Sequence, residues 1–529
     1  MKNKEIAFLF TVVLIAITMV IISFKISSLP YSTPDENIPS FFSQNLIKED
    51  TLKYSNTNIS QLSSNMSAIT LIPRGTYLIN QYIVPLQFPA WIYLLATFES
   101  IHPSFLFFIM PISYLMILLF SYVFLKSLFN KNYRYFVFLI FLILPTTVLW
   151  STMLFNNIIV SFIFIIGIFC FLKFVDSESD KYLILSSIFL FSSVFFRYEY
   201  FLFVAPLFFF VFFSKKRLKN TIIFFSIGLI YLVSILLINN LIFDSPFTTP
   251  YTIKPTTTYG KEFNLIPRMS FDAPRLYNNI LNHFINIFPA AFVIAILGLF
   301  IKIKKNFKEK KFIILILLCI IPLIFYGINL FFGYSEVNTS ILFSSYSRYW
   351  LGVYFLETVF LGLFFKYCGI NKKIKILISF FLVVLLILPS LAPDNKGVYF
   401  IYKEKSANQE FVDWVLANIE PDKTLILSIH ADEKLFPIRL TGTLDPSFVS
   451  FYKPDISNMP LENLAYLQAK DIAFLSKNYD IYLIEDGDSK AGLDISSINK
   501  NLNNYNLKLV YVETKKYNIF KLVKSDGAK

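Results

Sequence analysis

Long apolar runs, separated by short basic segments, make up the first three quarters of the chain. Runs of about 18 or more apolar residues are long enough to cross a bilayer as helices, and Pro or Gly within them is tolerated in membrane helices. The pattern predicts about eleven spans, near residues 6–26, 104–125, 135–151, 157–175, 181–197, 199–213, 221–243, 284–301, 312–332, 349–366 and 375–391. Two of these, 181–197 and 199–213, are short and are predicted to form a hairpin turning at the outer face. The segment 78–98 is also apolar, but its Pro85, Gln87 and Pro89 indicate an interfacial segment.

Basic residues gather in alternate loops. They lie at 126–134, 215–219, 302–311 and 366–375, whereas the long loops 27–103 and 244–283 hold few. The positive-inside rule therefore places the N-terminus in the cytoplasm. With an odd number of spans, the C-terminal part lies outside. Lys2 and Lys4 precede the first run, which we interpret as an uncleaved anchor. The sequons at Asn58, Asn65 and Asn338 fall in the predicted outer loops.

From about residue 392 the chain becomes polar and mixed in pattern. Ser406 and Gln409 form a capping-box pattern that predicts a helix start. Strands are predicted at 424–429 and 479–484, a helix at 461–478, and a closing hairpin from 507–513 and 517–523. We therefore expect a membrane domain over residues 1–391 and a soluble extracytoplasmic α/β domain over residues 392–529.

Composition narrows the function. The chain is 55% hydrophobic, with 62 Phe and a net charge of +13. The basic residues follow the loops, so they indicate topology and argue against nucleic-acid binding. The three cysteines form no disulfide framework. The chain lacks the sequence motifs of a P-loop, a dinucleotide fold, a zincin and a serine hydrolase.

An acidic pair, Asp35-Glu36, follows the first span within the outer loop 27–103. Adjacent carboxylates above the membrane could act as a general base toward a hydroxyl or amine, and they could hold a divalent cation such as Mg or Mn. Pro34-Asp35 is also ordinary turn chemistry, so a solvated turn is the alternative.

Arginines on the same side are candidates for binding phosphate. Arg197 stands within an apolar stretch, where a charge is costly and is usually paired or functional. It could bind a lipid phosphate through two N–H groups, or it could pair with Glu199 or anchor at the interface. Arg348 begins a span, where an aromatic-flanked anchor is the alternative. The other basic candidates are Arg74, Arg268 and Arg275.

Three weaker candidates complete the set. His283 lies near the outer end of a predicted helix, where a single His is more often structural. The segments 430–433 and 485–488 are acidic turns after predicted strands. Either could bind a cation, although acidic residues are common in such turns.

The order of these features resembles a known group. After Asp35-Glu36 come the Pro-and-aromatic stretch 84–94, then Leu144-Pro145-Thr146 within a stretch that ends at Trp150-Ser151, then Arg197, then Ser347-Arg348-Tyr349-Trp350. Over roughly residues 1–390 the chain looks like the membrane glycosyltransferases of the C-type (GT-C) fold. Among them it is similar to the protein mannosyltransferase and aminoarabinose transferase families (glycosyltransferase family 39-like).

The resemblance implies a donor sugar linked to a polyprenyl phosphate and an acceptor on the outer face. It implies Asp35 as catalytic base with Glu36 assisting, and Arg197 as a ligand of the donor phosphate. Arg74 and Arg348, on the same side, are further candidate ligands of that phosphate. Many relatives carry a second acidic residue where this chain has Asn156-Asn157. Those asparagines could bind substrate but could not act as a base. Tyr82 and His283 complete the candidate substrate-binding residues.

We therefore expect a multi-pass membrane glycosyltransferase with a polyprenyl-phosphate sugar donor, a protein, glycan or lipid acceptor, and no nucleic-acid partner. The alternatives are a polymerase or ligase of lipid-linked glycans, and a transporter or flippase. A transporter usually shows internal repeats or broken helices around midplane charges. The sequence shows no clear repeat. It leaves open which sugar and acceptor react, whether the carrier is dolichyl or undecaprenyl, and whether a metal is required.

Overall fold

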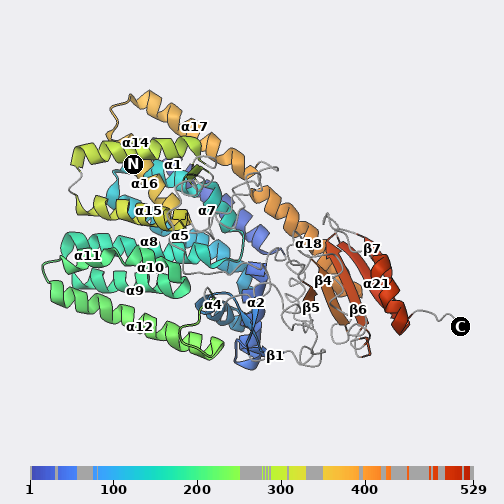
Figure 1. Ribbon diagram of the computed structural model, residues 1–529. Coiled ribbons are helices and arrows are strands. Elements are labelled where there is room, and N and C mark those ends of the chain that lie inside the picture. The colour runs from blue at the N-terminus through green and yellow to red at the C-terminus, as the bar shows by residue number, and fades with distance from the viewer. Residues whose placement is uncertain are drawn as a thin grey trace. The chain divides into compact units, whose positions relative to one another are not determined.

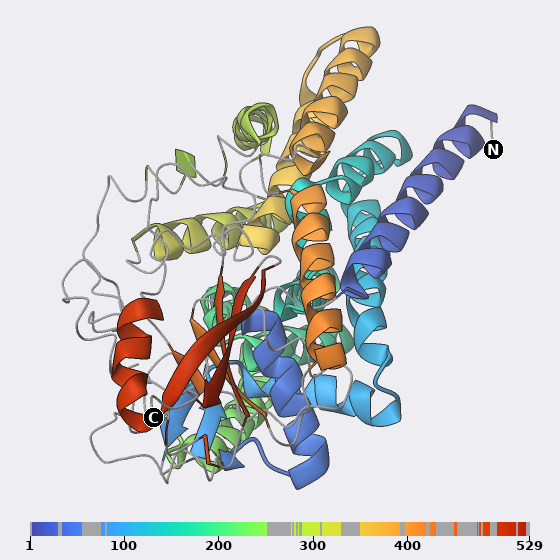
Figure 2. The same cartoon turned by 90° about the vertical axis from the view of Figure 1, so that its right-hand side faces the viewer.

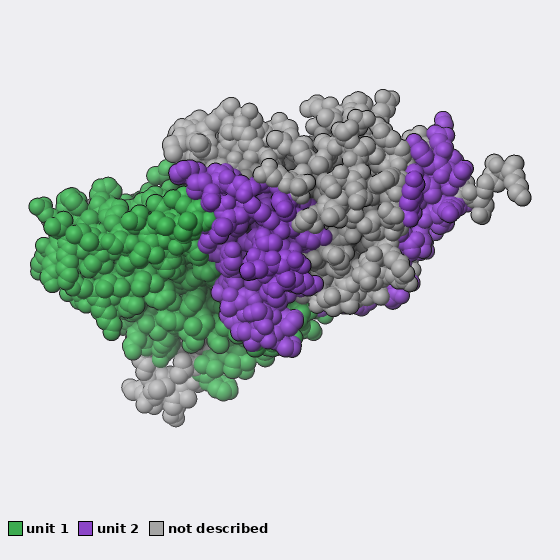
Figure 3. Space-filling view, turned by 90° about the horizontal axis from the view of Figure 1, so that it is seen from below, with its two compact units in different colours: residues 1–28, 104–237, 266–403 green, residues 29–103, 238–265, 404–529 purple. Residues whose placement is uncertain are grey.

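The computed structural model describes residues 3–29, 34–55, 76–79, 82–250, 277, 280–281, 284, 288–306, 309–328, 350–391, 397–418, 424–429, 449–451, 473, 476–477, 480–486, 495–514 and 517–524. The chain divides into two compact units, coloured in Figure 3. Unit 1 comprises residues 1–28, 104–237 and 266–403, and unit 2 comprises residues 29–103, 238–265 and 404–529.

The regular elements among the described residues of unit 1 are all helices. Its helices are α1 (Asn3–Ser27), α5 (Phe105–Leu128), α6 (Lys131–Leu142), α7 (Pro145–Trp150), α8 (Asn156–Ser177), α9 (Asp180–Phe196), the 3-10 helix η2 (Tyr198–Tyr200), α10 (Phe201–Val204), α11 (Leu207–Phe212), α14 (Pro289–Asn306), α15 (Lys310–Ile328), α16 (Leu351–Tyr367) and α17 (Lys372–Leu391). Helix α12 (Arg217–Phe243) and helix α18 (Val398–Asn418) each contribute residues to both units. Helix α8 packs along α9 and α5, and α14 packs along α16 (Figure 1).

These helices fall on the apolar runs of the sequence, and their surfaces are suited to lipid. Helices α5, α8 and α12 are long and apolar enough to cross a membrane among the residues that the structure describes. Helix α12 also exposes Ile222, Ile230 and Leu241, each by more than half. Lipid can cover such side chains, whereas water would disfavour so continuous an apolar face. The chain is therefore a membrane protein; the number of spans and their direction stay predictions.

Two predicted spans are interrupted by proline. The run 135–151 forms α6 and then α7, because Leu144 precedes Pro145 and adopts an extended conformation with φ −60° and ψ 117°. A residue before proline is disfavoured in the helical region. The run 199–213 likewise forms η2, α10 and α11, with Pro206 between the last two helices. Each of these two predicted helices is thus shorter than expected.

Unit 2 combines an early and a late part of the chain. Its early part contains α2 (Pro34–Glu49), β1 (Tyr54–Ser55), β2 (Thr76–Ile79), β3 (Tyr82–Pro85) and α4 (Pro89–Ile101). The three strands form an antiparallel sheet in the order β1-β3-β2. Helix α4 has only 13 residues, too few to span a bilayer upright. The apolar segment 78–98 thus forms β-structure and a short helix.

A five-stranded sheet occupies the late part of unit 2 (Figure 2). Its elements are β4 (Thr424–Ile429), β5 (Val449–Phe451), β6 (Asp480–Asp486), α21 (Ile495–Leu502), the 3-10 helix η12 (Asn503–Tyr505), β7 (Leu507–Thr514) and β8 (Tyr517–Lys524). The strand order is β5-β4-β6-β8-β7. Strands β5, β4 and β6 are parallel to one another, and β8 is antiparallel to both of its neighbours, β6 and β7. The predicted strand 424–429 and the closing hairpin are confirmed, whereas most of the predicted helix 461–478 lies outside the described residues.

The predicted helix start at Ser406 is wrong. Helix α18 begins at Val398, so Ser406 lies within it. The residues before Ser406 follow the amphipathic pattern of a helix, with Val398, Ile401 and Lys405 buried at spacings of three and four. A capping-box pattern cannot start a helix that has already been formed by the preceding turns.

Candidate active site

The acidic pair lies in the first turn of α2. Helix α2 begins at Pro34, whose fixed φ suits the first helical position. Asp35 and Glu36 follow directly, at the end of the helix where the macrodipole favours negative charge. The acidic pair therefore lies at a helix N-terminus and not in the solvated turn weighed as the alternative.

Glu36 is completely buried and forms an ion pair. Its Oε1 accepts a hydrogen bond from Lys405 Nζ at 2.7 Å, and the side chains of Glu36 and Lys405 are 0% and 1% exposed. Lys405 lies on α18, 369 positions later in the chain. The Glu36 carboxylate is therefore shielded from solvent, and its charge is compensated by a group that the sequence pattern did not single out.

The rest of α2 is fixed by apolar and polar packing. Ile38 and Phe42 are buried in a hydrophobic cluster with Val84 of β3, Ile92 of α4 and Phe243 of α12.

A second anchor of α2 is polar. Glu99 of α4 is 6% exposed and accepts hydrogen bonds from Ser43 Oγ at 2.5 Å and Gln44 Nε2 at 2.7 Å. Because a buried carboxylate needs such donors, these bonds also fix how α2 and α4 are aligned.

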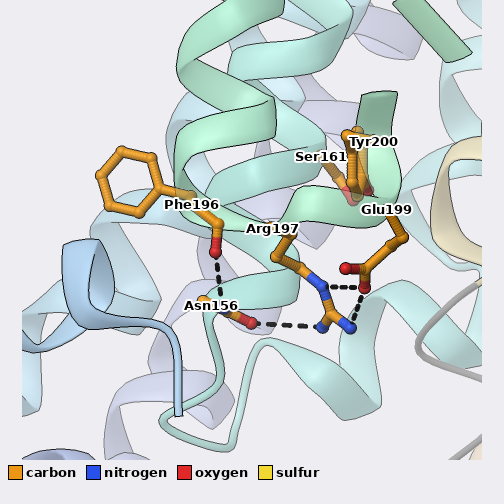
Figure 4. Close-up of polar contacts among 6 residues, drawn as sticks. All are labelled: Asn156, Ser161, Phe196, Arg197, Glu199 and Tyr200. Carbon is orange, nitrogen blue, oxygen red and sulfur yellow. Dashed lines mark hydrogen bonds and ion pairs between the residues drawn. The ribbon is translucent and has the colours of Figure 1, made fainter. Parts of the chain in front are cut away.

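Unit 1 contains a second polar cluster, centred on Arg197 (Figure 4). The guanidinium donates from Nε to Glu199 Oε1 at 2.5 Å and from Nη1 to Asn156 Oδ1 at 3.3 Å, and Nη2 also forms an ion pair with Glu199. Asn156 Nδ2 donates to the carbonyl of Phe196 at 3.3 Å. Arg197 is 3% exposed.

Local chain geometry produces this cluster. Helix α9 ends at Phe196, and Arg197 is extended, with φ −152° and ψ 110°. The 3-10 helix η2 then turns the chain so that Glu199 faces the guanidinium (Figure 4). Helix α8 begins at Asn156, which brings the amide to the same place. One turn along α8, Ser161 Oγ lies 3.3 Å from the hydroxyl of Tyr200.

Of the alternatives considered for Arg197, the ion pair with Glu199 is present. Two nitrogens of the guanidinium, Nε and Nη2, contact the same Glu199 carboxylate oxygen. Asn156 contacts this guanidinium. The next residue, Asn157, is buried, with 2% of its surface exposed. Binding of a phosphate or a sugar by these residues stays a prediction.

Other candidates are distributed differently. Tyr82 lies on β3 of unit 2, is 37% exposed, and is paired in register with Ser55 and Ile79. The remaining candidates fall outside the described residues: Arg74, Arg268, Arg275, His283, Arg348, the three sequons, the acidic segment 430–433 and the turn residues 487–488.

No group of three or more His, Cys, Asp or Glu side chains that could hold a metal is found among the residues that the structure describes. The side chain of Asp35 lies outside that description. A divalent cation at Asp35 and Glu36 therefore stays untested.

Sequence reasoning missed several buried charges, among them Glu99, Lys405 and Glu357. Lys405 had a detectable signal, because it shares a helical face with Val398 and Ile401. Glu357 of α16 is 8% exposed, and neither of its side-chain oxygens has a hydrogen-bond partner within the described part of the chain. It lies in a predicted span, where acidic residues are rare and often functional.

Comparisons with known proteins identify the fold. No protein-family model and no curated protein sequence matches the chain. A crystal structure of ArnT (aminoarabinose transferase) from Cupriavidus metallidurans bound to undecaprenyl phosphate matches with a TM-score of 0.58 and 10% identity, covering 97% of this chain and 98% of that one. The chain has the GT-C fold.

Two further structures agree. The apo state of the same ArnT gives a TM-score of 0.54 over the same shares of both chains, again at 10% identity. The apo oligosaccharyltransferase from Archaeoglobus fulgidus gives 0.50 at 13% identity, covering 90% of this chain and 69% of that one. The GT-C resemblance noted from the order of motifs is thus confirmed at the level of the fold, and the likeness extends beyond residue 390 into the C-terminal part.

Proposed function

We propose that the protein is an integral membrane glycosyltransferase that transfers a sugar from a polyprenyl-phosphate donor to an acceptor on the non-cytoplasmic face. The observation that carries this proposal is the likeness, over nearly the full length of both chains, to a GT-C enzyme solved with undecaprenyl phosphate. The acidic pair at the start of α2 and the buried Arg197 supply the residue types that such a reaction needs.

In this proposal Asp35 is the general base. The acceptor hydroxyl or amine attacks the anomeric carbon while its proton passes to the Asp35 carboxylate. The bond between the anomeric carbon and the phosphate oxygen breaks, and the electron pair leaves with the lipid phosphate. The reaction needs no oxidant or reductant.

Arg197 is proposed to stabilise the leaving lipid phosphate. Its guanidinium holds the carboxylate of Glu199 in the structure. A phosphate is an oxyanion of similar hydrogen-bonding geometry, so it can compete with that carboxylate for the same N–H groups. Charge developing on the leaving group would then be stabilised within a site of low exposure.

Because Asn156 and Asn157 stand where many relatives have an acid, the proposal assigns proton removal to Asp35 alone. Asn156 is assigned to orienting Arg197 through the 3.3 Å contact. Whether the reaction requires a Mg or Mn ion at Asp35 is tested by measuring transfer with and without a chelator.

The likeness to an oligosaccharyltransferase supports a second candidate, transfer or ligation of a preassembled lipid-linked glycan. The two candidates share the donor phosphate and differ in the mass of the group transferred. Mass spectrometry of the product separates them.

The test uses the purified full chain with a panel of radiolabelled undecaprenyl- and dolichyl-phosphate sugars. Wild type is compared with Asp35→Asn and with the control Asp50→Asn, which changes an exposed Asp just after the same helix. Loss of a general base typically costs about 10²–10⁴-fold in rate. We expect that loss for Asp35→Asn and a wild-type rate for Asp50→Asn.

Two outcomes would contradict the proposal. Folded wild-type protein that turns over no donor, with or without divalent cation, would remove the enzyme assignment. Movement of a substrate across sealed vesicles without formation of a glycosidic product would favour a transporter.

A further inference from the structure

The buried pair of Glu36 and Lys405 is weak evidence for added stability. Taking a carboxylate and an ammonium out of water is costly, and apolar residues of similar volume often stabilise a fold at least as well. The pair nevertheless lies at 0% and 1% exposure, with a hydrogen bond of 2.7 Å. The hydrogen bond of such a pair is directional, so it can fix the position of one helix relative to the other.

The Glu36–Lys405 pair lies next to the proposed base. Glu36 is adjacent to Asp35 in the first turn of α2. The hydrophobic cluster and the bonds from Ser43 and Gln44 to Glu99 act further along the helix. Lys405 therefore acts on the turn that carries the proposed base, and it does so from the late part of the chain.

We propose that Lys405 is a positioning residue, which clamps the first turn of α2 through Glu36 and so fixes the backbone that carries Asp35. Glu36 then serves as the attachment point of this clamp, and it takes no part in proton transfer. This inference rests on the proposed function. It gives the late part of unit 2 a role in the reaction that the sequence could not assign.

The decisive experiment exchanges the two charges. Glu36→Lys and Lys405→Glu are made singly and together, and kcat and KM for the donor are measured for each. Each single variant places two like charges together and should lose at least 100-fold in kcat. The double variant restores an ion pair in reversed order and should recover to within about tenfold of wild type. Recovery would show that the ion pair matters and that its order does not.

A second set separates positioning from folding. Lys405→Met removes the ammonium group from the buried Glu36 carboxylate, whereas Glu36→Gln with Lys405→Met removes both charges and should keep the wild-type unfolding temperature. We expect both variants to lose at least tenfold in kcat with KM for the donor within about twofold. Lys403→Met, at an exposed position of the same helix, is the matched control and should keep the wild-type kcat.

The outcomes are distinct. A wild-type kcat in the neutral double variant, or failure of the charge-reversed double variant to exceed its single variants although folded, would overturn the positioning role alone. Absence of transfer by the wild-type chain would overturn the proposed function and this inference with it.

Discussion

At the scale of single residues, two of the candidate residues form ion pairs in the described structure, one with a near neighbour in sequence and one with a distant residue. Arg197 and Glu199 are two residues apart, so a local ion pair could be weighed from the sequence, and the structure contains it. Glu36 and Lys405 are 369 positions apart, and no local pattern links them. Pairing across such a distance depends on tertiary packing, which periodicity does not encode.

The Arg197 cluster leads to a prediction about stability. Arg197→Met leaves Glu199 buried without its cation, and breaking one side of a buried pair costs about 3–5 kcal/mol. Adding Glu199→Gln removes the uncompensated charge and should return most of that loss. The measurement is the free energy of unfolding in a double-mutant cycle. Additive effects of the two substitutions would show that the pair contributes no coupling.

At the scale of elements, small residues determine how closely the helices of unit 1 approach. A Cβ atom at Gly298 of α14 would lie 2.1 Å from the Phe360 carbonyl oxygen and 2.8 Å from the Phe364 backbone nitrogen, both in α16. Small residues at such crossings are typical of membrane helix pairs. Because the obstructing atoms belong to the backbone, they cannot move aside without shifting a helix.

We expect Gly298→Ala to destabilise unit 1. Alanine would gain up to about 1 kcal/mol in helix propensity, but overpacking typically costs about 1–3 kcal/mol. The unfolding temperature in detergent should therefore fall. Gly369→Ala is the control, because a Cβ there meets nothing within 4 Å. An unchanged unfolding temperature for Gly298→Ala would show that α14 and α16 do not pack this closely.

The elements also show how far sequence patterns can be used. Apolar runs locate the helices well, because lipid-facing and core-facing positions are both apolar along α5, α8 and α12. Strands β4, β7 and β8 were predicted from their turn signals and alternation. The sheet β1-β3-β2 was missed, since its strands have two to four residues and lie within a stretch that is apolar on average.

For the candidate site, the sequence indicates candidate residues but not the contacts that they make. The acidic pair and Arg197 stand out in the sequence by their position next to apolar runs. The hydrogen bond from the Arg197 guanidinium to Asn156 is known only from the structure. That Glu36 is buried, and that Lys405 compensates it, follows only from packing between early and late segments.

At the scale of the whole molecule, the topology is the main untested prediction. In a Cys368→Ser background, Lys500→Cys and Lys304→Cys each introduce an exposed thiol, on α21 and on the last turn of α14. The positive-inside rule places the first outside the cell and the second in the cytoplasm. A membrane-impermeant maleimide should label the Lys500→Cys variant in intact cells, and the Lys304→Cys variant only after permeabilisation. The reverse labelling would invert the predicted orientation.

The clamp on α2 also has a consequence for biosynthesis. Ribosomes add about 5–20 residues per second, so the 369 residues between Glu36 and Lys405 take roughly 20–70 s to synthesise. Throughout that interval Glu36 has no Lys405 to pair with, and its carboxylate must stay in contact with water until α18 packs against α2. A polypeptide terminated before Lys405 would never form the pair. We therefore expect such a truncated chain to be degraded faster in cells than the full chain, which pulse-chase labelling would measure.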